Sequence, residues 1–300
     1  MHIFYNLFLP DSTLGLPFPL ACAFILALGG IIGSFLNVVI HRVPREESIV
    51  FPNSRCPECS TAIRPYDNIP VISYLILRGR CRACGASISA RYPAVEAFTA
   101  LLYLAVFFHD GATLALPFDL VFVTALVALI FIDAEHMILP NVITYPGLLF
   151  VLVARLAIPL LTGRPFFDDL EAGMTGAPVD WPIWAASLVG ALVGALAGGG
   201  SLWLMGWLWE RLRGVEAMGL GDVKMMFMVG AYLGWRLTTV TIFLAVLAGS
   251  LTGIALMLRR GQKDMQMLLP FGIFLGAGAI ISLLVGGLIV SWYAAQFGIQ

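Results

Sequence analysis

Long apolar segments, separated by short polar ones, run through most of the chain. The first covers residues 20–40, and a helix needs about 20 residues to cross a bilayer. Seven further apolar segments follow, at 94–109, 117–135, 142–161, 183–209, 223–235, 238–258 and 268–293. The pattern predicts an all-α polytopic membrane protein with about eight transmembrane helices.

The polar region between the first two segments, residues 41–92, is the only stretch large enough for a small soluble domain. It holds eight of the seventeen Lys and Arg residues: Arg42, Arg45, Arg55, Arg64, Arg78, Arg80, Arg82 and Arg91. Basic residues gather on the cytoplasmic side of membrane proteins. We therefore expect residues 1–40 to hold the first helix, 41–92 a cytoplasmic domain, and 93–300 a seven-helix membrane domain.

The same rule orients the remaining segments. Alternation from residues 41–92 places the turns 136–141, 210–222 and 259–267 in the cytoplasm, and the acidic loop 162–182 and both termini outside. The last two cytoplasmic turns hold the basic residues Arg211, Arg213, Arg259, Arg260 and Lys263. The predicted orientation is therefore consistent along the whole chain.

The composition agrees with a membrane protein. Hydrophobic residues make up 60% of the chain and charged residues only 12%, whereas soluble domains carry about a quarter charged residues. The net charge of −1 provides no overall basic field, so we expect no nucleic-acid partner. The expected partner is the lipid bilayer.

Two aspartates stand where an apolar segment meets a turn. Asp133 closes the segment 117–135, and Asp222 directly precedes the segment 223–235. In the predicted topology both lie at the cytoplasmic surface. A carboxylate at membrane depth is costly and is therefore a functional candidate. Two adjacent carboxylates share one proton, so one can activate water while the other hydrogen-bonds a scissile carbonyl. The pair predicts amide hydrolysis by Asp133 and Asp222.

The residues around Asp222 add candidate contacts. Gly219 and Gly221 precede it, and glycine allows unusual dihedrals and a close approach of the substrate backbone. Lys224 follows it and is suited either to tune the acid or to anchor a headgroup. Taken singly, each aspartate is equally consistent with a solvated residue at a helix end, where Asp222 would complement the helix dipole.

Four cysteines form two pairs, Cys56-x-x-Cys59 and Cys81-x-x-Cys84, separated by the 21 residues 60–80. Four thiolates fill the tetrahedral shell of Zn²⁺ and leave no open position, so the spacing favours structural zinc. Disulfides and a redox pair are the alternatives, but stable disulfides are rare in the cytoplasm. The fifth cysteine, Cys22, lies in an apolar segment and is typical of a core residue.

The stretch Gly-Leu-Gly-Asp-Val-Lys at 219–224 resembles the GxGD signature of intramembrane aspartyl proteases, in the version found in bacterial prepilin peptidases. Further motifs of that family match at 33–44, 66–74, 89–96 and 270–272. The resemblance covers nearly the whole chain in the expected order. The cysteine tetrad favours the bifunctional bacterial form over archaeal preflagellin peptidases, which lack that loop.

The resemblance implies a bifunctional enzyme of the bacterial inner membrane. Such an enzyme cleaves type IV prepilins and type II secretion pseudopilins after a Gly at the cytoplasmic face. It then N-methylates the new N-terminal residue, usually Phe, with S-adenosylmethionine. Asp133 and Asp222 occupy the family's two catalytic positions.

Alternative functions are a peptidase without methyl transfer, a transporter that carries protons on the Asp pair, and a zinc metalloprotease. The last has no His-Glu-x-x-His motif to support it. No Gly-x-Gly-x-x-Gly follows a predicted strand, so the sequence does not independently locate a site for S-adenosylmethionine. We expect that site where the Arg-rich loop meets the helices, with Glu46, Glu47 or residues 66–68 as candidates.

Overall fold

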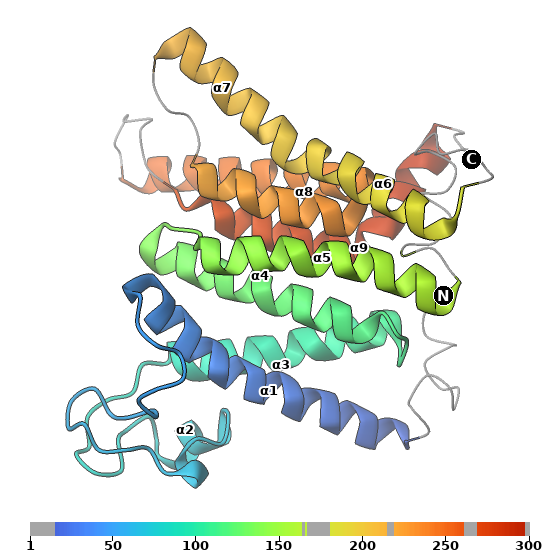
Figure 1. Cartoon of the computed structure of the whole chain (residues 1–300). Coiled ribbons are helices and arrows are strands. Elements are labelled where there is room, and N and C mark those ends of the chain that lie inside the picture. The colour runs from blue at the N-terminus through green and yellow to red at the C-terminus, as the bar shows by residue number, and fades with distance from the viewer. Residues whose placement is uncertain (1–15, 164–165, 167–180, 215–218, 261–268, 298–300) are drawn as a thin grey trace. The chain divides into compact units, whose positions relative to one another are not determined.

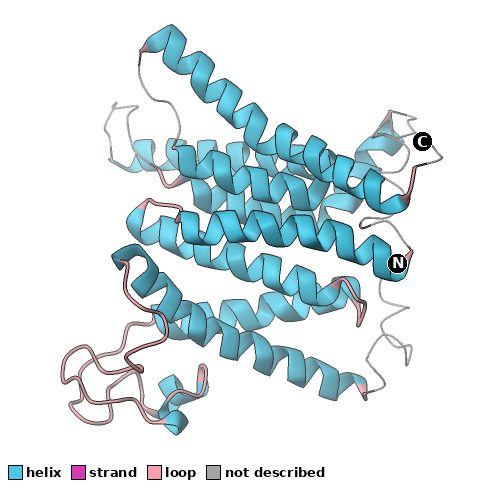
Figure 2. Cartoon of the chain, viewed as in Figure 1, coloured by secondary structure: helices cyan, strands magenta, loops and turns pink. Residues whose placement is uncertain are grey.

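The computed structural model describes residues 16–163, 166, 181–214, 219–260 and 269–297. Over these residues the chain forms helices and loops and no strand (Figure 2). A helix satisfies its backbone hydrogen bonds within its own segment, as a lipid-embedded chain requires. The predicted all-α class is confirmed. The loop 162–182 and the turn 259–267, to which the topology prediction assigned sides, lie largely outside the described residues.

Seven helical stretches of the described chain are long and apolar enough to cross a membrane, so the chain is a multi-pass membrane protein. They are Phe18–Arg45, Arg91–Asp110, Leu116–His136, Asn141–Thr162, Ile183–Arg213, Leu220–Arg259 and Phe271–Gln296. The count is seven rather than the predicted eight because the predicted segments 223–235 and 238–258 fall within one stretch.

That stretch, helix α8 (Leu220–Arg260), reverses direction at Gly234. Gly234 has φ 74° and ψ 169°, a conformation essentially restricted to glycine. A Cβ atom on Gly198 would lie 2.5 Å from the Met226 carbonyl oxygen and 3.0 Å from Thr238 Cγ2. In a straight helix residues 226 and 238 would be about 18 Å apart. Both can border Gly198 only if the chain turns back, so α8 is a hairpin of two helices that match the two predicted segments.

The chain divides into two compact units, Met1–Ala128 and Leu129–Gln300. In the first unit α1 (Phe18–Arg42) packs along α3 (Arg91–Asp110) (Figure 1). A Cβ atom on Gly33 of α1 would lie only 2.7 Å from a Cα atom of α3. Small residues therefore let these two helices approach closely, as they do in other membrane proteins.

Between α1 and α3 runs the polar region, which is mostly loop. It contains the 3-10 turns η3 (Val43–Arg45) and η4 (Pro65–Asp67) and the short helix α2 (Ile72–Ile76). Asn37, buried in α1, donates hydrogen bonds from its side-chain amide to the carbonyl oxygens of Gly33 and Tyr92. The start of α3 is thereby fixed to α1.

The second unit contains the end of α4 and the helices that follow it. After α4 (Leu116–His136) come α5 (Asn141–Thr162), α6 (Ile183–Ala195), the π-helical turn η5 (Leu196–Gly200), α7 (Ser201–Arg213), α8 and α9 (Phe271–Gln296) (Figure 1). The first half of α8 lies in the core, where Met225, Met226 and Met228 are fully buried. A Cβ atom on Gly194 of α6 would lie 2.1 Å from the Gly230 carbonyl oxygen, so α6 and α8 pack backbone to backbone.

A buried arginine holds the break in α8. Arg155 of α5 is fully buried and donates from Nε to the Ala231 carbonyl at 2.9 Å and from an Nη atom to the Tyr232 carbonyl at 2.8 Å. These carbonyls belong to the last turn before Gly234, where the helix can no longer supply partners. The guanidinium group therefore caps the first half of α8 inside the membrane domain.

Candidate active site and metal centre

Asp133 lies near the end of α4 and is 5% exposed. Its Oδ2 atom accepts a hydrogen bond at 3.1 Å from the backbone N–H of Ile273, in the first turn of α9. The first N–H groups of a helix have no partner within the helix, and they carry partial positive charge. The start of α9 therefore orients and stabilises the Asp133 carboxylate.

Gly272 allows α9 to come this close. A Cβ atom at this position would lie 2.8 Å from Asp133 Oδ2 and 3.2 Å from Leu139 Cδ1. Contacts that short are essentially absent for real side chains, so any larger residue would displace the carboxylate or α9. The Pro-Phe-Gly motif at 270–272 thus acquires a physical role that the sequence did not reveal.

Asp222 lies in the first turn of α8 and is half-buried. It is close enough to Asp133 for the two carboxylates to interact electrostatically. The structure thus brings together, within the second unit, two aspartates from helices that are distant in sequence. Their catalytic roles remain a prediction.

The glycines before Asp222 differ in their surroundings. A Cβ atom on Gly221 would lie 3.0 Å from Leu139 Cβ, whereas a Cβ atom on Gly219 would meet nothing closer than Asp222 Oδ2 at 3.8 Å. Gly221 is already part of helix α8. Close packing against Leu139, rather than an unusual dihedral angle, is therefore the reason for glycine at position 221.

Lys224 points toward α5. Its Nζ atom donates a hydrogen bond to Asn141 Oδ1 at 2.9 Å and lies 5.4 Å from the centre of the Tyr145 ring. Both contacts connect the start of α8 to the start of α5. These contacts test neither of the two roles predicted for Lys224. They show that Lys224 links the start of α8 to the start of α5.

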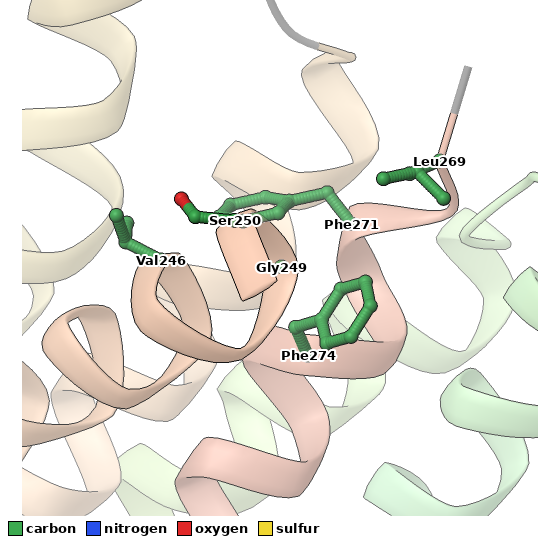
Figure 3. A pocket seen from close by; sticks show the side chains of 6 residues that line it. All are labelled: Val246, Gly249, Ser250, Leu269, Phe271 and Phe274. Atoms are coloured by element: carbon green, nitrogen blue, oxygen red, sulfur yellow. The ribbon is translucent and has the colours of Figure 1, made fainter. Parts of the chain in front are cut away.

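An apolar cavity of about 240 Å³ lies beside α9 (Figure 3). It is lined by Val246, Gly249 and Ser250 of α8 and by Leu269, Phe271 and Phe274. Figure 3 shows the two phenylalanines on the α9 side of the cavity and Val246 on the α8 side. The cavity therefore offers room for an apolar side chain between α8 and the start of α9.

The four predicted cysteine ligands come together in the first unit. The Sγ atoms of Cys56, Cys59, Cys81 and Cys84 all lie within 4.8 Å of one another. Among the described residues this is the one group of three or more His, Cys, Asp or Glu side chains arranged to hold a metal ion. No histidine belongs to it, which removes the structural basis for a metalloprotease site there.

Both cysteine pairs lie on turns of the same design. In the first turn the Cys56 N–H bonds to the Thr61 carbonyl, and the Ser60 N–H bonds to the Cys56 carbonyl. In the second, the Cys81 N–H bonds to the Ala86 carbonyl, and the Gly85 N–H to the Cys81 carbonyl. Ser60 and Gly85 both have positive φ. The repeated geometry presents two sulfur atoms per turn toward a shared centre.

The protonation of the sulfurs fits a divalent cation. Hydrogen bonds with Thr61 lower the pKa of the Cys59 thiol to about 6, and those from the backbone of residues 84 and 83 lower the pKa of Cys81. Despite a backbone hydrogen bond with Ala86, burial and the neighbouring thiols raise the pKa of Cys84 to about 12. Four adjacent sulfurs cannot all be thiolates without a cation, whereas Zn²⁺ stabilises all four.

An ion pair joins the second cysteine turn to the motif at 66–68. Arg82 binds both carboxylate oxygens of Asp67, with distances of 2.6–3.0 Å. The guanidinium groups of Arg64 and Arg82 also lie 5.8 and 5.6 Å from the centre of the Tyr66 ring. Asp67, a candidate for S-adenosylmethionine binding, is thus already engaged in a structural contact.

Sequence reasoning missed several residues that build these sites. Arg155 carried a readable signal, because it is the only charged residue within the apolar segment 142–161. No sequence signal identifies the Ile273 N–H or the Leu139 side chain, because nothing in the sequence distinguishes this N–H from other backbone N–H groups or this leucine from other leucines. Their roles depend on which helices become neighbours.

Two known families match the chain. The bacterial peptidase A24 N-terminal domain matches residues 27–109, and the type IV leader peptidase family matches residues 120–254. Among solved structures, none matches.

Several curated bacterial proteins resemble the chain over most of its length. The prepilin leader peptidase/N-methyltransferase of Pseudomonas aeruginosa is 37% identical over 296 residues, covering 91% of this chain and 93% of the relative. The protein of that name from Aeromonas hydrophila is 37% identical over 290 residues, covering 89% and 91%. The one from Myxococcus xanthus is 41% identical over 244 residues, covering 81% and 65%.

Proposed function

Because the chain belongs to the type IV leader peptidase family, we propose that it removes the leader from prepilins and N-methylates the new N-terminal residue, with Asp133 and Asp222 as the proteolytic pair. The relatives that match nearly end to end are named for both activities. The observation that supports the assignment of residues is the meeting of two carboxylates where α4, α8 and α9 converge.

The paired carboxylates suit hydrolysis of a peptide bond without a metal. One carboxylate takes a proton from water, which attacks the carbonyl carbon, while the other donates a hydrogen bond to the carbonyl oxygen. The tetrahedral intermediate then collapses and the C–N bond breaks, while the carboxyl group that took the proton from water gives it to the leaving amine. The N–H of Ile273 keeps Asp133 oriented throughout, which lowers the cost of arranging the reacting groups.

The finer features of the reaction follow from the resemblance. Cleavage occurs after a Gly at the cytoplasmic face of the inner membrane, and pseudopilins of type II secretion are further substrates. A prepilin combines a hydrophobic helix with a short basic leader. Such a helix lies in lipid beside the membrane domain, and its leader reaches the aspartates from the cytoplasm. The apolar cavity between α8 and the start of α9 offers room for one of its side chains.

The cysteine tetrad is proposed to bind structural zinc. Bound to Cys56, Cys59, Cys81 and Cys84, Zn²⁺ would supply folding energy to a loop region that contains little regular structure. The proposed methyl donor is S-adenosylmethionine.

One experiment separates the two activities. Purified enzyme is incubated with a prepilin and S-adenosylmethionine carrying a labelled methyl group, and cleavage and label transfer are measured together. We expect the prepilin to be cleaved both with and without S-adenosylmethionine. We expect the labelled methyl group on the cleaved product only in the reaction that contains S-adenosylmethionine. Cleavage without any label transfer would contradict the methyltransferase assignment alone. If a folded preparation showed neither cleavage nor label transfer, the peptidase assignment would be contradicted. A transporter that carries protons on the aspartate pair would then be the alternative to test.

A further inference from the structure

We infer that residues 69–76, within the polar region 41–92, form a re-entrant segment whose helix α2 contacts the acyl chains of the cytoplasmic leaflet. The segment belongs to a run of ten residues, 68–77, without a charged side chain, which lies between Asp67 and Arg78. Apolar runs of 10–14 residues are too short to span a bilayer but are typical of re-entrant or interfacial segments.

The depth of the segment follows from its contacts with α1. A Cβ atom on Gly30 would lie 3.3 Å from Pro70 Cβ, so Pro70 packs directly against Gly30. Gly30 stands twelve residues before Arg42, which is about 18 Å along the helix axis. Because the hydrocarbon core of a bilayer is about 30 Å thick, Pro70 lies well inside it.

Helix α3, which packs against α1 at this level, gives a second measure of the depth of Gly30. Gly29, the neighbour of Gly30, packs against Ala100, where a Cβ atom would lie 2.7 Å from the Ala100 Cα. Ala100 stands nine residues after Arg91, which is about 14 Å along α3. The two helices therefore place Gly30, against which Pro70 packs, more than 10 Å beyond the arginines that mark their cytoplasmic ends. The contact of the segment itself with α3 is at Glu96, which stands five residues, about 8 Å, after Arg91.

Backbone N–H groups of the segment donate hydrogen bonds to other groups of the protein, as a chain in lipid requires. The Val71 N–H donates to Glu96 Oε2 at 2.7 Å, and the Ile69 N–H donates to Ser73 Oγ at 3.0 Å. The Ile72 N–H bonds to the Pro70 carbonyl at 2.6 Å, across a tight turn in which Val71 has φ 60°. This conformation is strained for a β-branched residue. Glu96 thus holds the turn that begins α2.

The side chains of α2 present an apolar surface. Ile72, Leu75 and Ile76 are 54%, 67% and 69% exposed, whereas Ser73 is buried and donates to the Tyr66 carbonyl. An uncovered set of large aliphatic side chains is unfavourable in water. At the depth of Gly30, however, the surrounding medium is hydrocarbon, so lipid is the occupant that this surface fits.

The test is photo-crosslinking of the full-length enzyme in liposomes. A benzophenone amino acid is introduced at Leu75 or Ile76, at Ile31 on the exposed face of α1, and at Ile63 in the first cysteine turn, which is 41% exposed. After irradiation, phospholipid adducts are measured by mass spectrometry of the intact protein. We expect the yield of lipid adducts at Leu75 and Ile76 to be comparable with that at Ile31. We expect no lipid adduct at Ile63.

Two results would overturn the inference. The first is absence of lipid adducts at Leu75 and Ile76 while Ile31 gives them. The second is cross-linking of Leu75 to other parts of the chain in place of lipid. If the photo-reactive variants fail to fold, Leu75→Lys and Ile63→Lys are compared in nanodiscs. We expect a lowered melting temperature for Leu75→Lys alone, and equal melting temperatures would contradict a lipid-embedded α2.

Discussion

The two aspartates have different surroundings, although they form one pair. Asp133 is nearly inaccessible and is held by the Ile273 N–H, whereas Asp222 is half-buried in the first turn of α8. The fixed member is therefore oriented by the protein before substrate arrives. We expect the more accessible member to be the one nearer to an incoming peptide.

The substitution Gly272→Ala tests how precisely the Asp133 carboxylate must be positioned. In Gly272→Ala the new methyl group would lie 2.8 Å from Asp133 Oδ2, so the carboxylate must shift. Misplacement of a reacting group by about 1 Å can cost about 100-fold in rate. We expect a loss of cleavage of that order, measured as kcat/KM on a prepilin in detergent, in a protein that remains folded.

Gly287→Ala is the matched control, because it lies in the same helix and its new Cβ atom would meet nothing within 4 Å. It should cleave at the wild-type rate. If Gly272→Ala were also fully active, the contact between α9 and Asp133 would have no part in catalysis.

At the scale of elements, the feature that organises the second unit is the break in α8. It lets the chain place a short, largely buried helix in the core, with Asp222 in the first turn of that helix. The break frees carbonyl groups at membrane depth, and Arg155 bonds to two of them. Arg155 and Gly234 thus act together to support the helix that carries Asp222.

Replacing Arg155 should therefore destabilise the membrane domain. Arg155→Met retains apolar volume but leaves the Ala231 and Tyr232 carbonyls without their donor, at a cost of about 2–4 kcal/mol. We expect a clearly lower unfolding temperature in detergent. Arg211→Met, at the exposed end of α7, should unfold at the wild-type temperature. Equal unfolding temperatures for all three proteins would show that Arg155 is dispensable for the hairpin.

The cysteine turns make a second prediction at this scale. Cys→Ser at any one of positions 56, 59, 81 or 84 removes one of four thiolates and should lower the zinc content of the purified protein well below that of wild type. Elemental analysis measures this directly. Cys22→Ser, in α1 and outside the tetrad, should keep the full content. Tetrad variants with undiminished zinc and full activity would rule out structural zinc at this site.

At the scale of the whole molecule, periodicity and charge predicted most of the helices to within a few residues. Burial in lipid makes apolar runs long and their ends charged, and both features are local in sequence. The places of Asp133 and Asp222 at the ends of apolar segments, and the spacing of the two cysteine pairs, are likewise local in sequence. The capping of the Ala231 and Tyr232 carbonyls by Arg155 could not be predicted from the sequence, because it depends on contacts between distant helices.

The polar region 41–92 shows the same limit. Its arginines predicted one cytoplasmic domain, yet Pro70 packs against the middle of α1. The eight arginines of residues 41–92 make the region polar on average, although residues 68–77 within it carry no charge. The depth of that run became evident only from its neighbours in α1 and α3.

The central claim is that Asp133 and Asp222 together hydrolyse the prepilin leader bond. Its most direct test is cleavage of a prepilin in detergent by wild type, Asp133→Asn and Asp222→Asn, with folding checked by thermal unfolding. Each Asn variant keeps its shape but loses one of two proton-transfer groups that cannot replace each other. We expect an active wild type and no cleavage by either folded variant. Substantial cleavage by either one would contradict the two-aspartate mechanism.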